Sequence, residues 1–224
     1  SSEKLKEGLS TLEGSLAVDT EFHAESRFSP ELMWIQIADR AGRCVLVDAQ
    51  VTQLLAPTVE FLSTRDLILH AGHHDLALLC PFGAINHERV FDTQLAAGLT
   101  GSGYPINLGR ILEKKLNLKV SKAEGLSDWS ARPPKPEQIV YAAEDVLHLH
   151  ALKEALSNQE CAVSMAQVVP NLLKENLVIP PDNQLWKAFR AAVILDDRGR
   201  EVLRRTAIWR NNVAKKENRQ PVIV

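Results

Sequence analysis

Apolar and polar residues alternate along the first 156 positions in blocks that are typical of an α/β domain. Short apolar runs at residues 16–22, 34–39 and 43–48 predict three strands, and their short connections indicate antiparallel pairing. Two more short strands follow, separated by helical patterns, so we expect these two to be parallel. The pattern predicts an α/β fold with a mixed five-stranded sheet flanked by helices. The later strands are residues 67–70 and 86–91, and the helices are residues 3–13, 51–63, 74–80, 92–99, 108–116 and 136–156.

Beyond about residue 157 the apolar spacing becomes wholly helical. Residues 184–195 and 199–214 predict a helical hairpin, and we therefore place a boundary near residue 160 and a helical extension over residues 161–224. Residues 183–224 have a net charge of +6, whereas residues 1–182 have −8. An acidic body that holds a metal and a basic extension that contacts phosphates would divide the charge in this way. A solvated helical face explains the charge of the extension equally well.

The overall composition excludes several classes of protein. A net charge of −2 argues against nucleic-acid binding through bulk positive charge. Cys44, Cys80 and Cys161 lie far apart and form no CxxC unit, which indicates reduced thiols and no zinc site. No run approaches the roughly 18 apolar residues of a membrane span, and the amino end has no signal-peptide core. We therefore expect a cytoplasmic protein without a membrane partner.

Paired acids provide the candidate chemistry. Asp19 and Glu21 end a predicted strand and point to the same face, an arrangement that is costly unless a cation lies between them. Tyr141 and Asp145 lie one turn apart on a predicted helix, so a phenol and a third acid share one face. Taken alone, the first pair could be an exposed strand end and the second a surface pair. Together they favour a metal-dependent phosphodiesterase.

A further acid follows the fourth predicted strand. Gly72 permits a sharp turn there, and Asp75 falls in the first turn of the next helix. Open α/β sheets bind ligands at this carboxyl end of parallel strands. Asp is also a common residue at a helix start, so the position alone does not decide between the two roles.

These segments resemble a known family. In order and spacing they are similar to the three motifs of the DEDD family of 3′-to-5′ exonucleases, tyrosine subtype, which has a ribonuclease H-like fold. Accessory segments resemble the ribonuclease D group, and the likeness runs from about residue 15 to residue 156. The motifs are Asp19-x-Glu21, His70-Ala71-Gly72-x-x-Asp75 and Tyr141-x-x-x-Asp145, and the accessory segments are Phe91-Asp92-Thr93-Gln94, Ser121-Lys122-Ala123-Glu124 and Ser127-Asp128-Trp129-Ser130-Ala131-Arg132-Pro133.

The resemblance implies that residues 1–160 form a 3′-to-5′ exonuclease domain that releases nucleoside 5′-monophosphates from RNA 3′ ends, with tRNA trailers the usual substrate. Carboxylate and water oxygens suit Mg²⁺ or Mn²⁺, and two such ions can serve the attacking and leaving oxygens of a displacement. By resemblance, Asp19 bridges both ions, Glu21 and Asp145 complete the first site, and Asp75 supports the second through water. Tyr141 would orient the attacking water, since a phenol with a reference pKa near 10 is a poor base at neutral pH.

The resemblance also suggests nucleic-acid contacts near the acids. Lys122 and Arg132 would pair with phosphate, Trp129 could stack a base, and Phe22 could wedge against the terminal nucleobase. Core packing is the alternative for Trp129 and Phe22.

The extension resembles the region that links the ribonuclease D catalytic domain to its HRDC helical modules. Trp186 and the segment Ala207-Ile208-Trp209-Arg210 support this likeness, but too little chain follows for a whole module. The sequence is then a short-form relative or a shortened chain.

Two other functions remain open. One is a DNA 3′-to-5′ exonuclease of the same fold with single-stranded DNA as its partner, because the catalytic core does not itself read the sugar type. A recognition site for the 2′-hydroxyl would discriminate RNA from DNA, and a sequence cannot show such a site. The other is a non-catalytic RNA-binding module. The complete acid set argues against a pure binder, which has no reason to gather anions where phosphate must come.

Overall fold

The fold is that of a computed structural model, which describes residues 1–24, 27–120, 127–157, 163–165, 167–169, 171 and 181–221. The chain divides into two compact units. The first comprises Ser1–Phe22 and Leu32–Leu177, and the second comprises His23–Glu31 and Val178–Val224. The predicted boundary near residue 160 stays a prediction, because residues 158–162 lie outside the described part of the chain.

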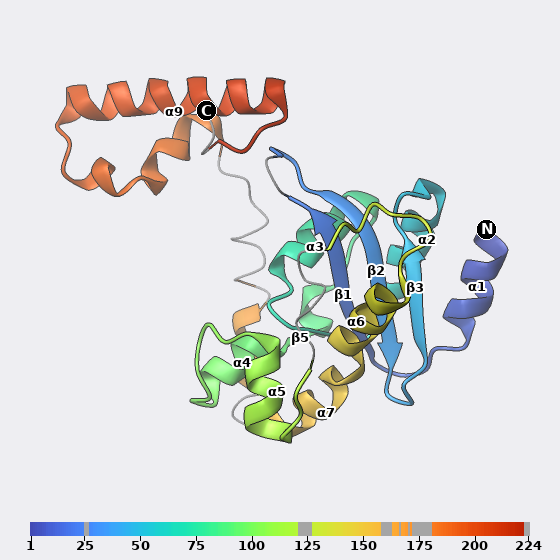
Figure 1. The fold of residues 1–224 in the computed structure, drawn as a ribbon. Coiled ribbons are helices and arrows are strands. Elements are labelled where there is room, and N and C mark those ends of the chain that lie inside the picture. The colour runs from blue at the N-terminus through green and yellow to red at the C-terminus, as the bar shows by residue number, and fades with distance from the viewer. Residues whose placement is uncertain are drawn as a thin grey trace. The chain divides into compact units, whose positions relative to one another are not determined.

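A five-stranded mixed sheet forms the centre of the first unit, as predicted (Figure 1). Its order is β3-β2-β1-β4-β5. β2 and β3 are antiparallel, with Trp34 opposite Asp48, whereas β4 is parallel to both β1 and β5. The strands are β1 (Leu16–His23), β2 (Glu31–Asp39), β3 (Cys44–Asp48), β4 (Leu67–Leu69) and β5 (Val90–Asp92).

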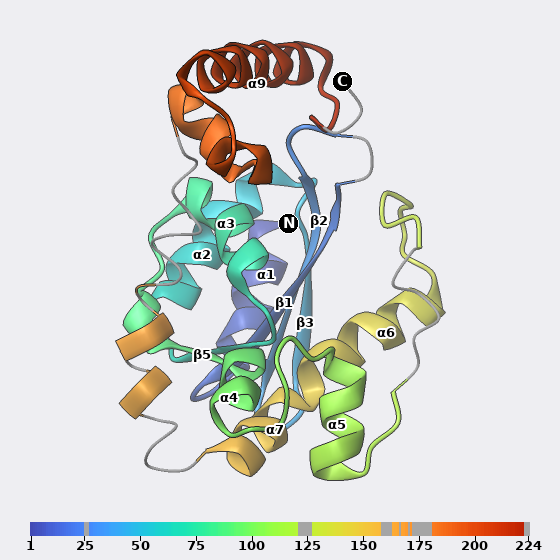
Figure 2. The ribbon, with the colours of Figure 1, turned by 90° about the vertical axis from the view of Figure 1, so that its left-hand side faces the viewer.

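Helices cover both faces of this sheet. Figures 1 and 2 show α1 (Ser2–Ser10), α2 (Leu55–Ser63) and α3 (His73–Leu79) on one face and α6 (Pro136–Leu147) on the other. The predicted flanking helices are therefore confirmed. A continuous apolar core fills the space between the layers. Its fully buried members include Leu16, Ile35, Ile68, Leu76 and Leu149. The remaining helices of this unit include α4 (Thr93–Leu99), α5 (Leu108–Leu116) and α7 (Leu149–Leu156), and its 3-10 turns include Thr52–Leu54, Cys80–Phe82 and His87–Arg89.

One predicted helix is two helices in the structure. α6 ends at Leu147 and α7 begins at Leu149, with His148 between them at φ −94° and ψ −7°. The helical spacing of buried positions continues across this break, since Ala142 and Val146 are followed by Leu149. No Gly or Pro marks it, so the sequence pattern predicts a single helix over residues 136–156.

The second unit contains the long helix α9 (Asp197–Glu217), which confirms the predicted C-terminal helix. The helix predicted over residues 184–195 is wrong. The structure has two 3-10 segments there, Asp182–Ala188 and Arg190–Val193. Asp196 begins α9 by accepting a hydrogen bond from the Gly199 backbone N–H at 2.7 Å. No helix among the described residues is long and apolar enough to cross a membrane.

Candidate active site

Three acids from two elements meet at the carboxyl end of β1. Asp19 and Glu21 share a strand face because side chains alternate along a strand, and Asp145 reaches them from α6. Each offers a carboxylate oxygen, and the three oxygens lie within 4.8 Å of one another. The structure thus brings together these three predicted residues.

The fourth acid approaches from the opposite side of the strand. Asp75 lies in the first turn of α3 and is 7% exposed. Its carboxylate accepts a hydrogen bond from the hydroxyl of Thr20, which lies between Asp19 and Glu21 and faces the other way. Thr20 therefore fixes Asp75 against β1, a role that sequence reasoning missed because a Thr in a strand gives no functional signal.

The four carboxyl groups resist ionisation as a set. Burial and the charges of Asp75, Asp145 and Glu21 raise the pKa of Asp19 well above its usual value. Burial and the charges of Asp145 and Asp75 raise the pKa of Glu21 to about 8. The pKa values of Asp75 and Asp145 are each raised to about 6, chiefly by burial. A divalent cation would relieve both the repulsion and the loss of hydration, so these residues fit a metal site.

Tyr141 lies one helical turn before Asp145 and is half-buried. Its hydroxyl hydrogen-bonds to the Asp145 carboxylate. Burial and the charges of Asp145, Glu21 and Asp19 raise the pKa of this phenol far above its usual value. Tyr141 therefore stays protonated across the neutral range and can donate or orient a hydrogen bond, but it does not serve as a base.

The turn between β4 and α3, which places Asp75, depends on a second buried aspartate. Asp92 accepts hydrogen bonds from the backbone N–H groups of Ala71 at 3.2 Å and Gly72 at 2.9 Å, and it also caps α4. The left-handed residue is Ala71, at φ 58°. Gly72 has φ −73°, and a Cβ there would lie 2.5 Å from that of Leu69. Gly72 is thus needed for close packing, whereas its predicted role was a permissive backbone.

We expect Asp92→Ala to destabilise the protein and to weaken metal binding. It removes the α4 cap, worth about 1 kcal/mol, and leaves the buried N–H of Gly72 unsatisfied at a cost of about 1–3 kcal/mol. Denaturant unfolding and Mn²⁺ titration measure the two effects. Asn107→Ala is the matched control, because it removes the Asn107 cap of α5 alone. Equal Mn²⁺ affinity in both variants would contradict a role for Asp92 in placing Asp75.

Two of the predicted nucleic-acid contacts, Trp129 and Arg132, make their contacts within the protein. Trp129 is 2% exposed and packs with Trp34 and Ala142, so it offers no free face to a base. Arg132 lies at the surface, but its guanidinium donates hydrogen bonds to Asp48 and to three backbone carbonyls. These contacts favour a structural role for both residues, for which the motif spacing gave no signal, and their contact with nucleic acid stays a prediction.

The other two predicted contacts are placed differently. Phe22 is half-buried beside His74, whose ring meets it edge-on with centroids 6.4 Å apart. It directly follows Glu21, so its contact with a terminal base stays a prediction. Lys122 lies outside the described residues.

A mixed sheet with four acids gathered beside its central strand is an arrangement that suits divalent cations. The chain belongs to the 3′-5′ exonuclease family, because residues 1–160 match the model of that family. This family membership confirms the resemblance on which the exonuclease interpretation of the motifs rests.

The chain is also similar to individual ribonuclease D proteins and to solved nuclease structures. Ribonuclease D of Bartonella henselae is 29% identical over 223 residues, covering 96% of this chain and 54% of the relative. The chain thus spans about half the length of the curated relatives it matches. Escherichia coli RNase D, an exoribonuclease involved in structured RNA processing, has a TM-score of 0.81 at 23% identity, covering 99% of this chain and 60% of that chain, which shows a shared fold. Brucella melitensis NrnC with bound Mg²⁺ has a TM-score of 0.62 at 27% identity, covering 73% of this chain and 83% of that chain.

Proposed function

We propose that this chain is a 3′-to-5′ exoribonuclease that hydrolyses RNA from its 3′ end and releases nucleoside 5′-monophosphates. One observation supports this above all others: four acids with raised pKa values surround the end of β1, beside a phenol that stays protonated. The likeness to ribonuclease D relatives favours RNA as the substrate. We propose tRNA or other structured RNA as the source of these 3′ ends. A cytoplasmic location belongs to the same proposal.

Each acid has a proposed task toward two Mg²⁺ or Mn²⁺ ions. Asp19 is proposed to hold both ions, because its carboxylate lies with those of Glu21 and Asp145 and it directly precedes Thr20, whose hydroxyl binds Asp75. Glu21 and Asp145 would complete one site and Asp75 the other. Bound divalent ions supply a nucleophilic water at neutral pH and neutralise the charge of the leaving oxygen. The Mg²⁺ bound to Brucella melitensis NrnC supports the choice of ion.

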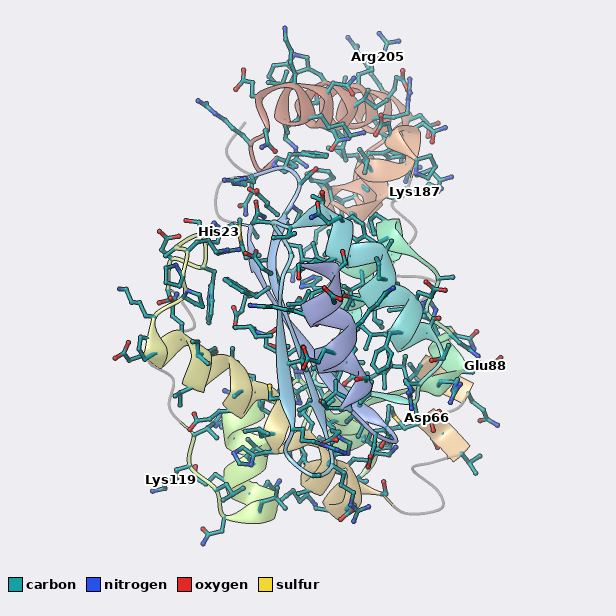
Figure 3. All side chains as sticks on the ribbon, turned by 90° about the vertical axis from the view of Figure 1, so that its right-hand side faces the viewer. His23, Asp66, Glu88, Lys119, Lys187 and Arg205 are labelled. Atoms are coloured by element: carbon teal, nitrogen blue, oxygen red, sulfur yellow. The ribbon has the colours of Figure 1, made fainter. Side chains whose placement is uncertain are left out.

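The helical extension over residues 161–224 is proposed to act as an accessory nucleic-acid contact, resembling the linker to an HRDC module. Basic side chains such as Lys187 and Arg205 project from the second unit (Figure 3). Several are already paired within α9, as Arg204 and Arg205 are with Glu201. The extension should therefore contribute affinity and salt dependence, while the chemistry stays in the first unit.

Digestion of matched RNA and DNA oligonucleotides tests the function. The substrates have the same sequence and a label at the 5′ end, and product ladders are followed with Mg²⁺, Mn²⁺ or EDTA. The proposal predicts that RNA is shortened stepwise, that the released products are mononucleotides, and that EDTA stops the hydrolysis. Faster shortening of DNA would support the alternative of a DNA exonuclease. Binding without shortening in any metal would support a non-catalytic RNA-binding module.

Tyr141→Phe is expected to slow hydrolysis by about 10- to 100-fold without changing the shape of the pH–rate profile. The variant lacks the hydroxyl that orients the attacking water. It loses no group that titrates in the assay, because the raised pKa of Tyr141 lies outside the assay range. Single-turnover rates from pH 6 to pH 9 provide the measurement. If the alkaline limb moves in this variant, Tyr141 titrates in the assay range and its role as an orienting donor is wrong.

A further inference from the structure

Arg132 lies at the centre of a clamp next to the proposed active site. Its Nε and Nη2 atoms donate to the two oxygens of Asp48, each at 2.8 Å. Its Cζ atom lies 3.9 Å above the ring of Trp34. Such a bidentate and stacked arrangement is specific to a guanidinium and would not survive replacement by an ammonium.

The same guanidinium also fixes the segment that precedes α6. Nη1 donates to the carbonyls of Trp129 at 2.7 Å and Ala131 at 3.1 Å, and Nη2 donates to the carbonyl of Met33 at 3.1 Å. With the two bonds to Asp48, all five N–H groups of the guanidinium have acceptors. None is left for a phosphate, so the charge of this side chain acts within the protein.

Trp129 is held from two directions. Its carbonyl accepts from Arg132 and also from the indole Nε1 of Trp34 at 3.0 Å. Its ring is 2% exposed and lies against Tyr141, with centroids 6.1 Å apart and an interplanar angle of 45°. The ring of Trp129 therefore forms a wall behind the phenol whose hydroxyl meets Asp145.

From this geometry we propose that Arg132 is a positioning residue for Tyr141: with Asp48 and Trp34 it fixes Trp129, and Trp129 sets the orientation of the Tyr141 ring toward Asp145. The inference rests on the proposed exonuclease activity, to which it adds a specific support for the water-orienting group. Small displacements of such a group have large effects, since a shift of about 1 Å can cost on the order of a hundredfold in rate.

Arg132→Lys and Asp48→Asn test the proposal kinetically. Both variants keep the size of the side chain but break the bidentate bond. We expect kcat to fall about tenfold and KM for RNA to change by less than about twofold, because Arg132 makes no bond to the substrate. In the Tyr141→Phe background the same changes should have almost no further effect, since the hydroxyl they position is gone. Arg89→Lys is the matched control.

Arg89 suits this purpose because it also donates to a carboxylate and a carbonyl, at 2.8 Å to Asp66 and 2.8 Å to Thr64. Figure 3 shows Asp66 and Glu88 at the edge of the first unit where β4 and β5 begin, away from the carboxyl end of the strands. Arg89→Lys should leave kcat and KM unchanged. Thermal unfolding of all three variants reports any loss of folding separately.

A spectroscopic measurement tests the geometry without any activity. The chain has two tyrosines, and Tyr104 is 64% exposed, so Tyr104→Phe leaves Tyr141 as a single reporter for fluorotyrosine labelling. The ¹⁹F resonance of Tyr141 should shift and broaden in Arg132→Lys but not in Arg89→Lys. This signal distinguishes the two failures. A wild-type protein that releases no nucleotide would contradict the proposed function, whereas an unchanged ¹⁹F resonance would contradict the inference.

Three results would overturn the positioning role. The first is a rise in KM with kcat unchanged and a weaker salt dependence, which would make Arg132 a phosphate contact. The second is an equal loss of rate with and without the Tyr141 hydroxyl, which would place its effect elsewhere. The third is an unchanged ¹⁹F resonance in a folded Arg132→Lys variant.

Discussion

Asp19→Asn should abolish nucleotide release, by roughly three orders of magnitude or more, and should weaken Mn²⁺ binding. The change keeps the shape of the side chain but removes a charge that interacts with Glu21, Asp75 and Asp145. Metal assistance is worth several kcal/mol in a displacement of this kind, and each 1.36 kcal/mol is a factor of ten in rate. Single-turnover hydrolysis and calorimetric Mn²⁺ titration measure the two losses.

The stability of this variant distinguishes a lost charge from a damaged fold. Because the ionised form of Asp19 is disfavoured by burial and by its neighbours, Asp19→Asn should leave the metal-free protein as stable as wild type at pH 8, or more stable. Retained activity in Asp19→Asn would remove the proposed mechanism.

Asp39→Asn is the matched control, because Asp39 is also buried but has the opposite environment. Although burial raises its pKa, hydrogen bonds from Arg43 and from the backbone of Glu13 lower the pKa of Asp39 below its usual value. Its loss should therefore lower stability and leave the rate of hydrolysis unchanged. The two aspartates should thus show opposite effects on folding and on chemistry.

The sequence could predict the acids because their roles follow from local spacing. Asp19 and Glu21 lie two residues apart on a strand, so they share a face of that strand. Tyr141 and Asp145 lie four residues apart on a helix, so they share a face of that helix. Neither relationship depends on the rest of the chain. The sheet was predictable for a similar reason, since alternating apolar runs and connection lengths determine which strands pair directly. The strand ends shifted by a few residues, as at β5, which the pattern began at residue 86 and the structure begins at Val90.

The supports of the site depend on contacts between distant residues and could not be predicted in this way. Asp92 holds the turn at Gly72 from 20 positions away, and Arg132 reaches Asp48 across 84 positions. Neither sequence separation follows from the repeat of a helix or a strand. An Arg next to a nuclease motif favours a phosphate contact by its charge alone. The position of its five acceptors, which gives it a structural role, appears only once β2, β3 and the segment before α6 are folded together.

The last prediction concerns stability and pH in metal-free protein. The folded-state pKa of Glu21 is about 8 and those of Asp75 and Asp145 are about 6, all above their usual values of 4.5 and 3.8. The native state therefore binds more protons than the unfolded chain between about pH 4 and pH 8. Under this condition the free energy of unfolding falls as pH rises through the window. Metal-free protein should thus be less stable at pH 8 than at pH 5.

The size of the effect follows from the shifts. Each pKa unit corresponds to 1.36 kcal/mol, and the coupled set should contribute on the order of a few kcal/mol, or roughly 10 °C in Tm for a chain of this length. Mn²⁺ binds the ionised acids in competition with protons, so it should raise Tm strongly at pH 8 and only weakly at pH 5. Scanning calorimetry with EDTA or Mn²⁺ at both pH values provides the measurement, and KCl at matched ionic strength controls for screening.

Glu21→Gln completes the test because it removes an acid whose pKa is raised to about 8. This variant should flatten the fall in Tm between pH 5 and pH 8 and reduce the stabilisation by Mn²⁺ at pH 8. The two changes must occur together, since both arise from the same crowded negative charge at the end of β1. If Tm in EDTA rises from pH 5 to pH 8, or if KCl replaces Mn²⁺, the acids are not held close enough to repel one another, and the proposed metal site is not built from them.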